Sequence, residues 1–131
     1  MEVRIYYEDT DAGGVVYHAN YLRYMERGRT EFLRERGLSV QAMHDEGIIF
    51  PVVAMELNYR SPARLDDLLE VETSILAVKN SSFVAGQKVL RKADGRLLVE
   101  ARVTLACVGA GMRAQRLPTE LRELLRTELN D

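Results

Sequence analysis

The sequence predicts an α+β domain in which one long helix packs against an antiparallel sheet. Residues 20–36 place apolar side chains at steps of three and four, the spacing of a helix with one buried face. Four later segments, 48–59, 68–78, 82–91 and 96–108, show the alternating or continuous apolar pattern of strands. Short turns separate several of these segments, and strands joined by short turns pair antiparallel. One apolar helix on one such sheet makes a two-layer fold.

The segment before the long helix is predicted to be a strand followed by a turn. Residues 3–8 alternate apolar and polar side chains, and residues 9–14 are turn-forming. Asn20 is expected to cap the start of the helix, and Gly37 is expected to end it. Gly28 lies within the apolar stripe, where glycine costs about 1 kcal/mol relative to alanine. We therefore expect another element to pack closely against the helix backbone at this position.

Capping and turn residues predict the remaining elements. Ser39 is expected to cap a short second helix, and Asp94 with Gly95 to form a tight hairpin. A proline opens a last helix, predicted over residues 118–130. The chain is long enough for one domain, predicted over residues 1–131. Several strands are long for so small a domain, so an edge strand is expected to pair with a second copy of the chain.

Composition excludes several classes of function. The net charge of −2 provides no overall field that would attract nucleic acid or an anionic membrane. The single cysteine, Cys107, cannot form an intrachain disulfide, which fits a reducing compartment. With His18 and His44 as the only histidines, no metal site and no cofactor are expected. No segment predicts a signal peptide or a transmembrane helix, so we expect a cytoplasmic protein.

Groups with catalytic potential are concentrated between the first strand and the long helix. Asp9 and Asp11 lie two residues apart, and Gly13 and Gly14 let the backbone approach a ligand closely. The first N–H groups of a helix lack intrahelical partners and can stabilise a developing oxyanion. A carboxylate that faces them across a carbonyl group would provide the parts for acyl transfer. Thioesters suit such a site better than amides, because a thiolate is the better leaving group.

Spacing alone also fits other structures and functions. An acidic loop with glycines before a helix is often an ordinary turn and cap, and His18 alone fits a structural role. Phosphate binding is disfavoured because no Gly-Lys-Ser/Thr sequence follows the glycines. The Asp9-Thr10-Asp11 spacing also resembles that of aspartyl phosphatases of the haloacid dehalogenase type. Those proteins have Thr or Val where Gly13 stands, and they contain repeated βα units that this sequence lacks.

One long motif is more specific than the spacing. The run of residues 6–21, YYEDTDAGGVVYHANY, resembles the signature of the 4-hydroxybenzoyl-CoA thioesterase family of hotdog-fold proteins. Within that family it is most similar to the acyl-CoA thioesterases associated with the bacterial Tol-Pal system. The likeness continues through residues 26–31 and 59–67 and covers the chain to about Val108. It implies a sheet wrapped around a central helix, a homodimer or homotetramer, and hydrolysis of acyl-CoA at the subunit interface.

The resemblance also implies roles for individual residues. Asp11 matches the family's catalytic carboxylate, as nucleophile or general base, and the backbone N–H of His18 matches the donor that polarises the carbonyl. Tyr7 matches a third position associated with the site, and Asp9 is expected to structure the loop. The expected substrate-binding residues are Gly14, Val15, Tyr17, Arg60 and Arg64. The two arginines would meet the phosphates of CoA, although exposed arginines also fit simple solvation.

Two rival functions remain open at this point. A hotdog hydratase or dehydratase would act on the same thioesters, but it needs a histidine with a carboxylate partner. A non-catalytic acyl-CoA sensor, or a scaffold for membrane-assembly proteins, would bind without turnover. The loop aspartate ahead of the helix favours hydrolysis over a hydratase, and the intact loop with Asp11 and His18 argues against a non-catalytic protein.

Overall fold

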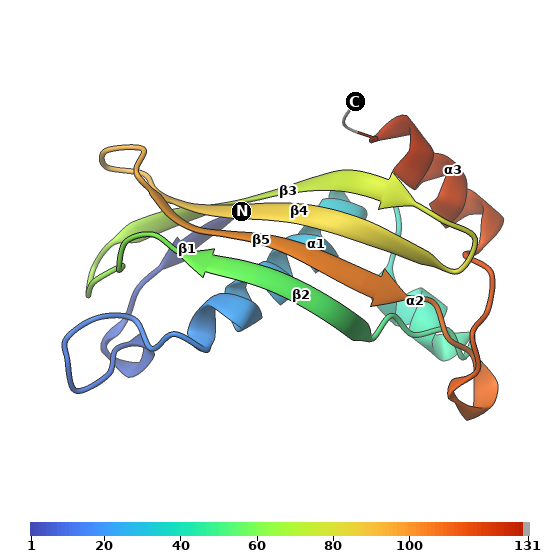
Figure 1. Cartoon of the computed structure of the whole chain (residues 1–131), viewed down its shortest axis with the longest axis horizontal. Helices are drawn as coiled ribbons and strands as arrows, with labels where there is room; N and C mark the ends of the chain where they lie inside the picture. The colour runs from blue at the N-terminus through green and yellow to red at the C-terminus, as the bar shows by residue number, and fades with distance from the viewer. Residues whose placement is uncertain (130–131) are drawn as a thin grey trace.

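The structure, a computed structural model, describes residues 1–129. Five strands form one antiparallel sheet in the order β1-β3-β4-β5-β2, and α1 crosses one of its faces (Figure 1). In chain order the elements are β1 (Glu2–Arg4), the 3-10 helix η1 (Tyr7–Asp9), α1 (Asn20–Glu35), α2 (Val40–Asp45), β2 (Val52–Tyr59), β3 (Leu68–Val78), β4 (Ser82–Arg91), β5 (Leu97–Ala106), the 3-10 helix η2 (Ala110–Met112) and α3 (Thr119–Thr127). The predicted α+β architecture is confirmed.

The core lies between α1 and the concave face of the sheet. Alternate residues of β3, β4 and β5 point toward the helix, and their registers align Val71 with Val89 and Val89 with Val99. These three valines are at most 3% exposed. From α1 the buried residues are Tyr21, Tyr24, Met25, Gly28, Phe32 and Leu33. Residues spaced three to four apart on α1 and residues spaced two apart on the strands therefore pack together in one apolar layer.

The backbone of α1 packs closely against the sheet at Gly28, as the sequence predicted. A Cβ atom at this position would lie only 2.7 Å from Cγ1 of Val71. The close approach lets the side-chain amide of Gln87, which is 2% exposed, donate to the backbone carbonyl of Met25 at 2.8 Å. The same amide donates to Oγ1 of Thr73 at 3.0 Å. A buried polar group is thereby paired across the two layers.

The predicted strand over residues 3–8 is wrong beyond Arg4. The chain turns into η1 because the Asp9 carboxylate accepts a hydrogen bond from the backbone N–H of Tyr6 at 2.8 Å. An aspartate that bonds backbone three residues away competes with strand pairing. The apolar alternation of this segment therefore does not extend the sheet.

The predicted cap at Asn20 is also wrong, whereas the cap at Ser39 is confirmed. Ala19 occupies the N-cap position of α1, and Asn20 is the first helical residue. The Oγ atom of Ser39 accepts from the N–H of Ala42 at 3.0 Å.

The turn at residues 92–96 is longer than the tight hairpin predicted at Asp94 and Gly95. Gly95 adopts a φ of 70°, as the prediction of a glycine-dependent turn requires.

The last helix, α3, is shorter than the predicted span of 118–130. Pro118 occupies its N-cap position, and residue 130 lies outside the described residues. Leu121 and Leu125 are at most 1% exposed, and α3 packs beside β3 (Figure 1). None of the helices within residues 1–129 is long and apolar enough to cross a membrane.

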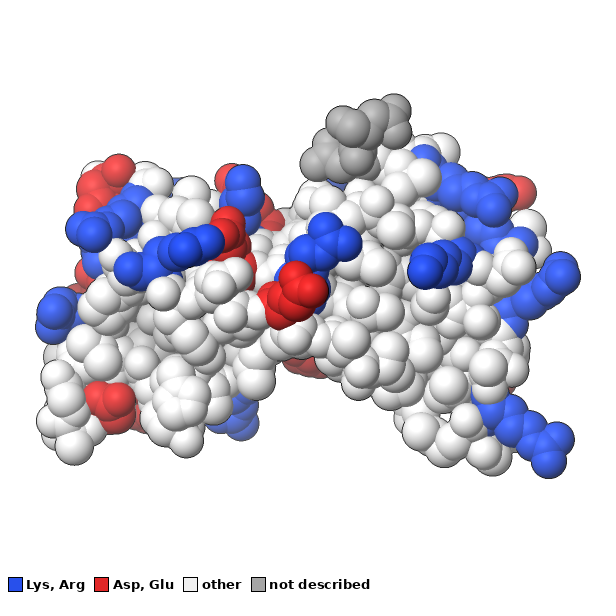
Figure 2. Space-filling view, in the orientation of Figure 1, with Lys and Arg blue, Asp and Glu red and all other residues white. Residues whose placement is uncertain are grey.

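Charged side chains are distributed unevenly over the outer face of the sheet. Figure 2 shows basic side chains at both ends of this face, near the β4–β5 connection and near α3, with acidic ones beside several of them. The middle of the face carries charges of both signs as well, among them Glu72 of β3, Lys88 of β4 and Arg102 of β5. Charges of both signs therefore lie near one another on this outer face.

We predict that Gly28→Ala destabilises the protein. Alanine favours the helix by about 1 kcal/mol, but its methyl group must displace Val71, and overpacking typically costs about 1–3 kcal/mol. Urea unfolding should therefore give a lower free energy of unfolding for the variant. As a matched control, the double variant Gly28→Ala/Val71→Ala should be less destabilised than the sum of the two single changes. Additive losses would contradict the contact.

Candidate active site

The segment between η1 and α1 folds into a tight hairpin. Thr10 pairs with Val16 in an antiparallel bridge, and the N–H of Asp11 donates to the carbonyl of Val15 at 2.9 Å. Gly14, at a φ of 78°, closes the turn by donating its N–H to the carbonyl of Asp11 at 3.0 Å. The positive φ explains the need for glycine there. The hairpin therefore presents Asp11 on its first arm, opposite Val15.

The carboxylate of Asp11 is exposed and forms no ion pair with any residue of the described range 1–129. Its Oδ1 atom accepts from the N–H of Gly13 at 2.8 Å, which fixes the side chain in an Asx turn. A Cβ atom at residue 13 would lie 3.2 Å from that oxygen, so glycine leaves room for it. Among the described residues, no lysine or arginine lies within ion-pairing distance of Asp11. The carboxylate is held in place and keeps its charge available.

The other arm of the hairpin leads directly into α1 and leaves backbone donors free. Within residues 1–129, the N–H groups of His18 and Ala19 have no hydrogen-bond acceptor. The carbonyl of His18 accepts from the hydroxyl of Tyr59 at 2.9 Å. The His18 ring lies between Tyr17, at 4.6 Å between ring centroids, and Tyr59, at 6.3 Å. His18 is thus an exposed residue within an aromatic group and not a core histidine.

A second loop, residues 60–67, holds the hairpin against the sheet. The N–H of Val16 donates to the carbonyl of Ala63 at 2.9 Å, and Val15 pairs with Arg64. Ala63 is fully buried, and its own N–H donates to the hydroxyl of Tyr21 on α1 at 3.1 Å. The hairpin, the second loop and the first turn of α1 are therefore hydrogen-bonded to one another.

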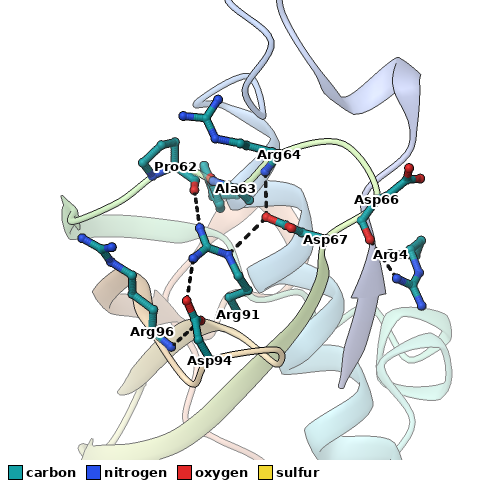
Figure 3. A network of polar contacts seen from close by, with 10 residues as sticks. Arg4, Pro62, Ala63, Arg64, Asp66, Asp67, Arg91, Asp94 and Arg96 are labelled. Carbon is teal, nitrogen blue, oxygen red and sulfur yellow. Dashed lines mark hydrogen bonds and ion pairs between the residues drawn. The ribbon is translucent and has the colours of Figure 1, made fainter.

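Arg91 fixes the second loop in turn, as Figure 3 shows. Its guanidinium donates to the Asp67 carboxylate at 3.3 Å, to Asp94 at 2.9 Å and to the carbonyl of Pro62 at 3.0 Å. The same Asp67 oxygen accepts from the N–H of Arg64 at 2.9 Å. The Arg91 side chain is 19% exposed, so these charge-assisted bonds are partly shielded from water.

The structure brings most of the predicted site residues together. Gly14, Val15, Tyr17 and His18 lie along the hairpin and the start of α1, close in sequence to Asp11. Tyr7 begins η1, and its carbonyl accepts from both the N–H and the hydroxyl of Thr10. Its side chain is 82% exposed.

The two predicted arginines differ. The Arg64 backbone pairs with Val15, while its side chain points away from the Arg91 network (Figure 3). Arg60 instead forms an ion pair with Glu100 of β5 at 2.5 Å.

Sequence analysis missed Tyr59, which joins the site through its bond to His18. The two residues are 41 positions apart, and Tyr59 looks like an ordinary strand residue in the sequence. It missed Ala63 for the same reason. The likeness to the family over residues 59–67 pointed to this segment, but it did not predict either contact.

The site remains open in a single chain. Besides the exposed Asp11, the residues Tyr7, Tyr17 and Tyr59 are 82%, 47% and 50% exposed. An apolar cavity of about 140 Å³ lies beneath α1 and α2, but Asp11 does not line it. Within residues 1–129, no three His, Cys, Asp or Glu side chains are arranged to hold a metal ion.

Sheet, central helix and loop together place the chain in a known class. The thioesterase-like superfamily matches residues 6–125, and the chain belongs to this family. A probable thioesterase from Bartonella henselae has a similar structure, with a TM-score of 0.80 and 39% identity, covering 90% of this chain and 96% of that one. The predicted hotdog fold is confirmed.

Curated relatives make the resemblance more specific. The chain is 47% identical over 120 residues to the acyl-CoA thioester hydrolase YbgC of Escherichia coli O6:H1, covering 91% of this chain and 89% of the relative. It is 43% identical over 122 residues to the acyl-CoA thioesterase YbgC of Haemophilus influenzae, covering 92% and 88%. The predicted similarity to the Tol-Pal-associated acyl-CoA thioesterases is thereby confirmed.

Two buried tyrosines of α1 lie beneath the loops, and both have altered acidity. Burial raises the pKa of Tyr21, although the bond from Ala63 opposes this. Burial, and next the neighbouring Asp9 carboxylate, raises the pKa of Tyr24 far above its ordinary value. The Tyr24 hydroxyl lies beside Asp9 but outside hydrogen-bonding geometry, and it has no partner among the described residues.

We predict that Tyr24→Phe makes stability less sensitive to alkali. A pKa that is higher in the folded state stabilises the fold below the unfolded pKa of about 10, and this contribution is lost as pH rises further. Urea unfolding between pH 9 and 11 should show a shallower decline for the variant. At pH 7 the variant should be at least as stable, because an unpaired buried hydroxyl is removed. Tyr6→Phe, at an exposed tyrosine, is the control; an equal slope in both variants would contradict the prediction.

Proposed function

We propose that this chain is an acyl-CoA thioesterase that hydrolyses its substrate to a free acid and CoA. The proposal depends on one observation within residues 1–129: the Asp11 carboxylate has no ion-pair partner, and the other arm of its hairpin ends in the N–H groups of His18 and Ala19, which have no acceptor. Membership of the thioesterase-like superfamily supports it, as do the names of the relatives.

The backbone donors would act on the thioester carbonyl. Its oxygen accepts from the N–H of His18, with Ala19 beside it, at the positive end of the α1 dipole. Negative charge develops on this oxygen when the carbonyl carbon is attacked. The loss of one such donor typically costs about 10²–10³ in kcat.

Asp11 would act by one of two routes. As a nucleophile, its carboxylate attacks the carbonyl carbon and expels CoA as a thiolate, and water then hydrolyses the resulting anhydride. As a general base, it takes a proton from water while the water attacks the same carbon and the thiolate leaves. Both routes give the same products. Hydrolysis in the presence of ¹⁸O-water separates them, because single turnover through an anhydride can place the label in Asp11.

The neighbouring residues would bind the substrate. Gly14 and Val15 form the turn of the hairpin, and Tyr7 and Tyr17 provide exposed aromatic surface beside Asp11. The exposed Arg64 would meet a CoA phosphate. Arg60 contributes only if it leaves Glu100, its partner on β5.

A second copy of the chain would complete the site, as a homodimer or homotetramer. β2 lies at an edge of the sheet and pairs only with β5 among the described residues. Its exposed apolar residues include Val53 at 59% and Tyr59 at 50%. Pairing of β2 with the same strand of a second copy would satisfy the free edge and bring new walls to the surface around His18. The single domain over residues 1–131 and the cytoplasmic location stay predictions.

We predict that Asp11→Asn lowers kcat by about 10²–10⁴-fold, because the amide neither attacks nor accepts a proton efficiently. The measurement is release of CoA thiol from a panel of short, long and aromatic acyl-CoA substrates. The amide oxygen keeps the bond from Gly13, so the thermal midpoint should hardly change. Asp45→Asn, on α2, is the matched control and should retain full activity. Unchanged turnover by Asp11→Asn would remove the basis of the mechanism.

The same panel tests the rival functions. Among the described residues His18 has no carboxylate within ion-pairing distance, whereas a hydratase needs such a pair. Loss of the double-bond absorbance of crotonyl-CoA without thiol release would identify a hydratase. Saturable binding of acyl-CoA without any turnover would identify a sensor or scaffold.

A further inference from the structure

Asn20 makes an unexpected contact at the first residue of α1. Instead of capping the helix, its side-chain amide donates to the backbone carbonyl of Asp9 at 2.9 Å in a partly buried position. This bond links the helix to the residue directly before the hairpin. The two partners are 11 positions apart, so the bond closes the loop of residues 9–20, which contains Asp11 and His18.

Asp9 is the junction of this loop. Its carbonyl also accepts from the N–H of Tyr17 at 2.9 Å, and its carboxylate accepts from the N–H of Tyr6 at 2.8 Å. Asp11 follows the junction by two residues, and His18 follows Tyr17 by one. The position of the carboxylate relative to the free N–H groups is therefore set by the bonds at Asp9.

The two bonds to the Asp9 carbonyl have separable roles. The bond from Tyr17 joins the two arms of the hairpin, whereas the bond from Asn20 joins the hairpin to the helix axis. A carbonyl oxygen has two lone pairs and can accept both donors. Loss of the Asn20 bond leaves the hairpin closed but frees it to move relative to α1. Misplacement of reacting groups by 1 Å can cost about 10²-fold in rate.

We propose that Asn20 is a positioning residue, which holds Asp11 in register with the backbone donors at the start of α1 by tying the Asp9 carbonyl to the helix. The proposal rests on the proposed thioesterase function. Asn20 itself acts through the loop and does not meet the reacting atoms.

The test compares Asn20→Ala with Asn20→Asp. A carboxylate in the first turn of a helix interacts favourably with the helix dipole. A merely structural role therefore predicts that the kcat of Asn20→Asp equals or exceeds that of the wild type. The positioning role predicts the opposite order, because an ionised carboxylate cannot donate and is repelled by the Asp9 carbonyl. We expect kcat to fall about tenfold to a hundredfold in Asn20→Ala and further in Asn20→Asp, with KM changed less than threefold.

Arg23→Asp is the matched control. It places the same carboxylate near the start of α1 at an exposed residue, and its kcat should stay near that of the wild type. Amide hydrogen exchange, measured by NMR, provides a readout independent of activity. Exchange of the Tyr17 and Asp11 N–H groups should accelerate in both Asn20 variants and not in Arg23→Asp.

Two results would overturn the proposal. One is a kcat of Asn20→Asp equal to or above that of the wild type. The other is unchanged exchange of the Tyr17 and Asp11 amides in both Asn20 variants. If the wild-type chain releases no thiol from any acyl-CoA, the proposed function fails instead, and amide exchange alone still decides whether Asn20 holds the loop.

Discussion

The close contact of α1 with the sheet at Gly28 is the constraint on which the rest of the structure depends. The missing side chain lets the helix backbone approach Val71, and Gln87 then bonds the helix carbonyl of Met25. A helix held at its middle by packing and by a buried hydrogen bond has a fixed direction relative to the strands. Because the helix is rigid, its direction also determines the position of its first turn relative to the strands.

The free end of this helix gives the site its chemistry. Among the described residues, the N–H groups of His18 and Ala19 have no acceptor, and no cation pairs with Asp11 on the hairpin before them. Three sets of bonds keep these parts together: those at Asp9, those from Ala63 to the hairpin and helix, and the ion pairs of Arg91 behind them. In the mechanism that we propose, such a site needs little from its own side chains except one carboxylate, because the fold provides the electropositive donors.

The arrangement also explains why the site is exposed in one chain. The hairpin lies at the end of the helix, beside β2, where the sheet has a free edge and aromatic side chains face solvent. A thioester carbonyl needs surroundings from which water is largely excluded for the backbone donors to have their full effect. In the assembly that we propose, a partner that covers the edge would exclude water from the same surface.

The sequence by itself determined what depends on short-range periodicity and on a long motif. The apolar stripe of residues 20–36 defined α1, the alternation of later segments defined the sheet, and the run around Asp11 identified the family. Tertiary structure decided what depends on contacts between distant residues. The turn at Tyr7 replaced a predicted strand, Asn20 bonded Asp9 instead of capping, and Tyr59 reached His18. The physical reason is that a hydrogen bond is satisfied by whichever partner the fold brings near, and local pattern does not specify that partner.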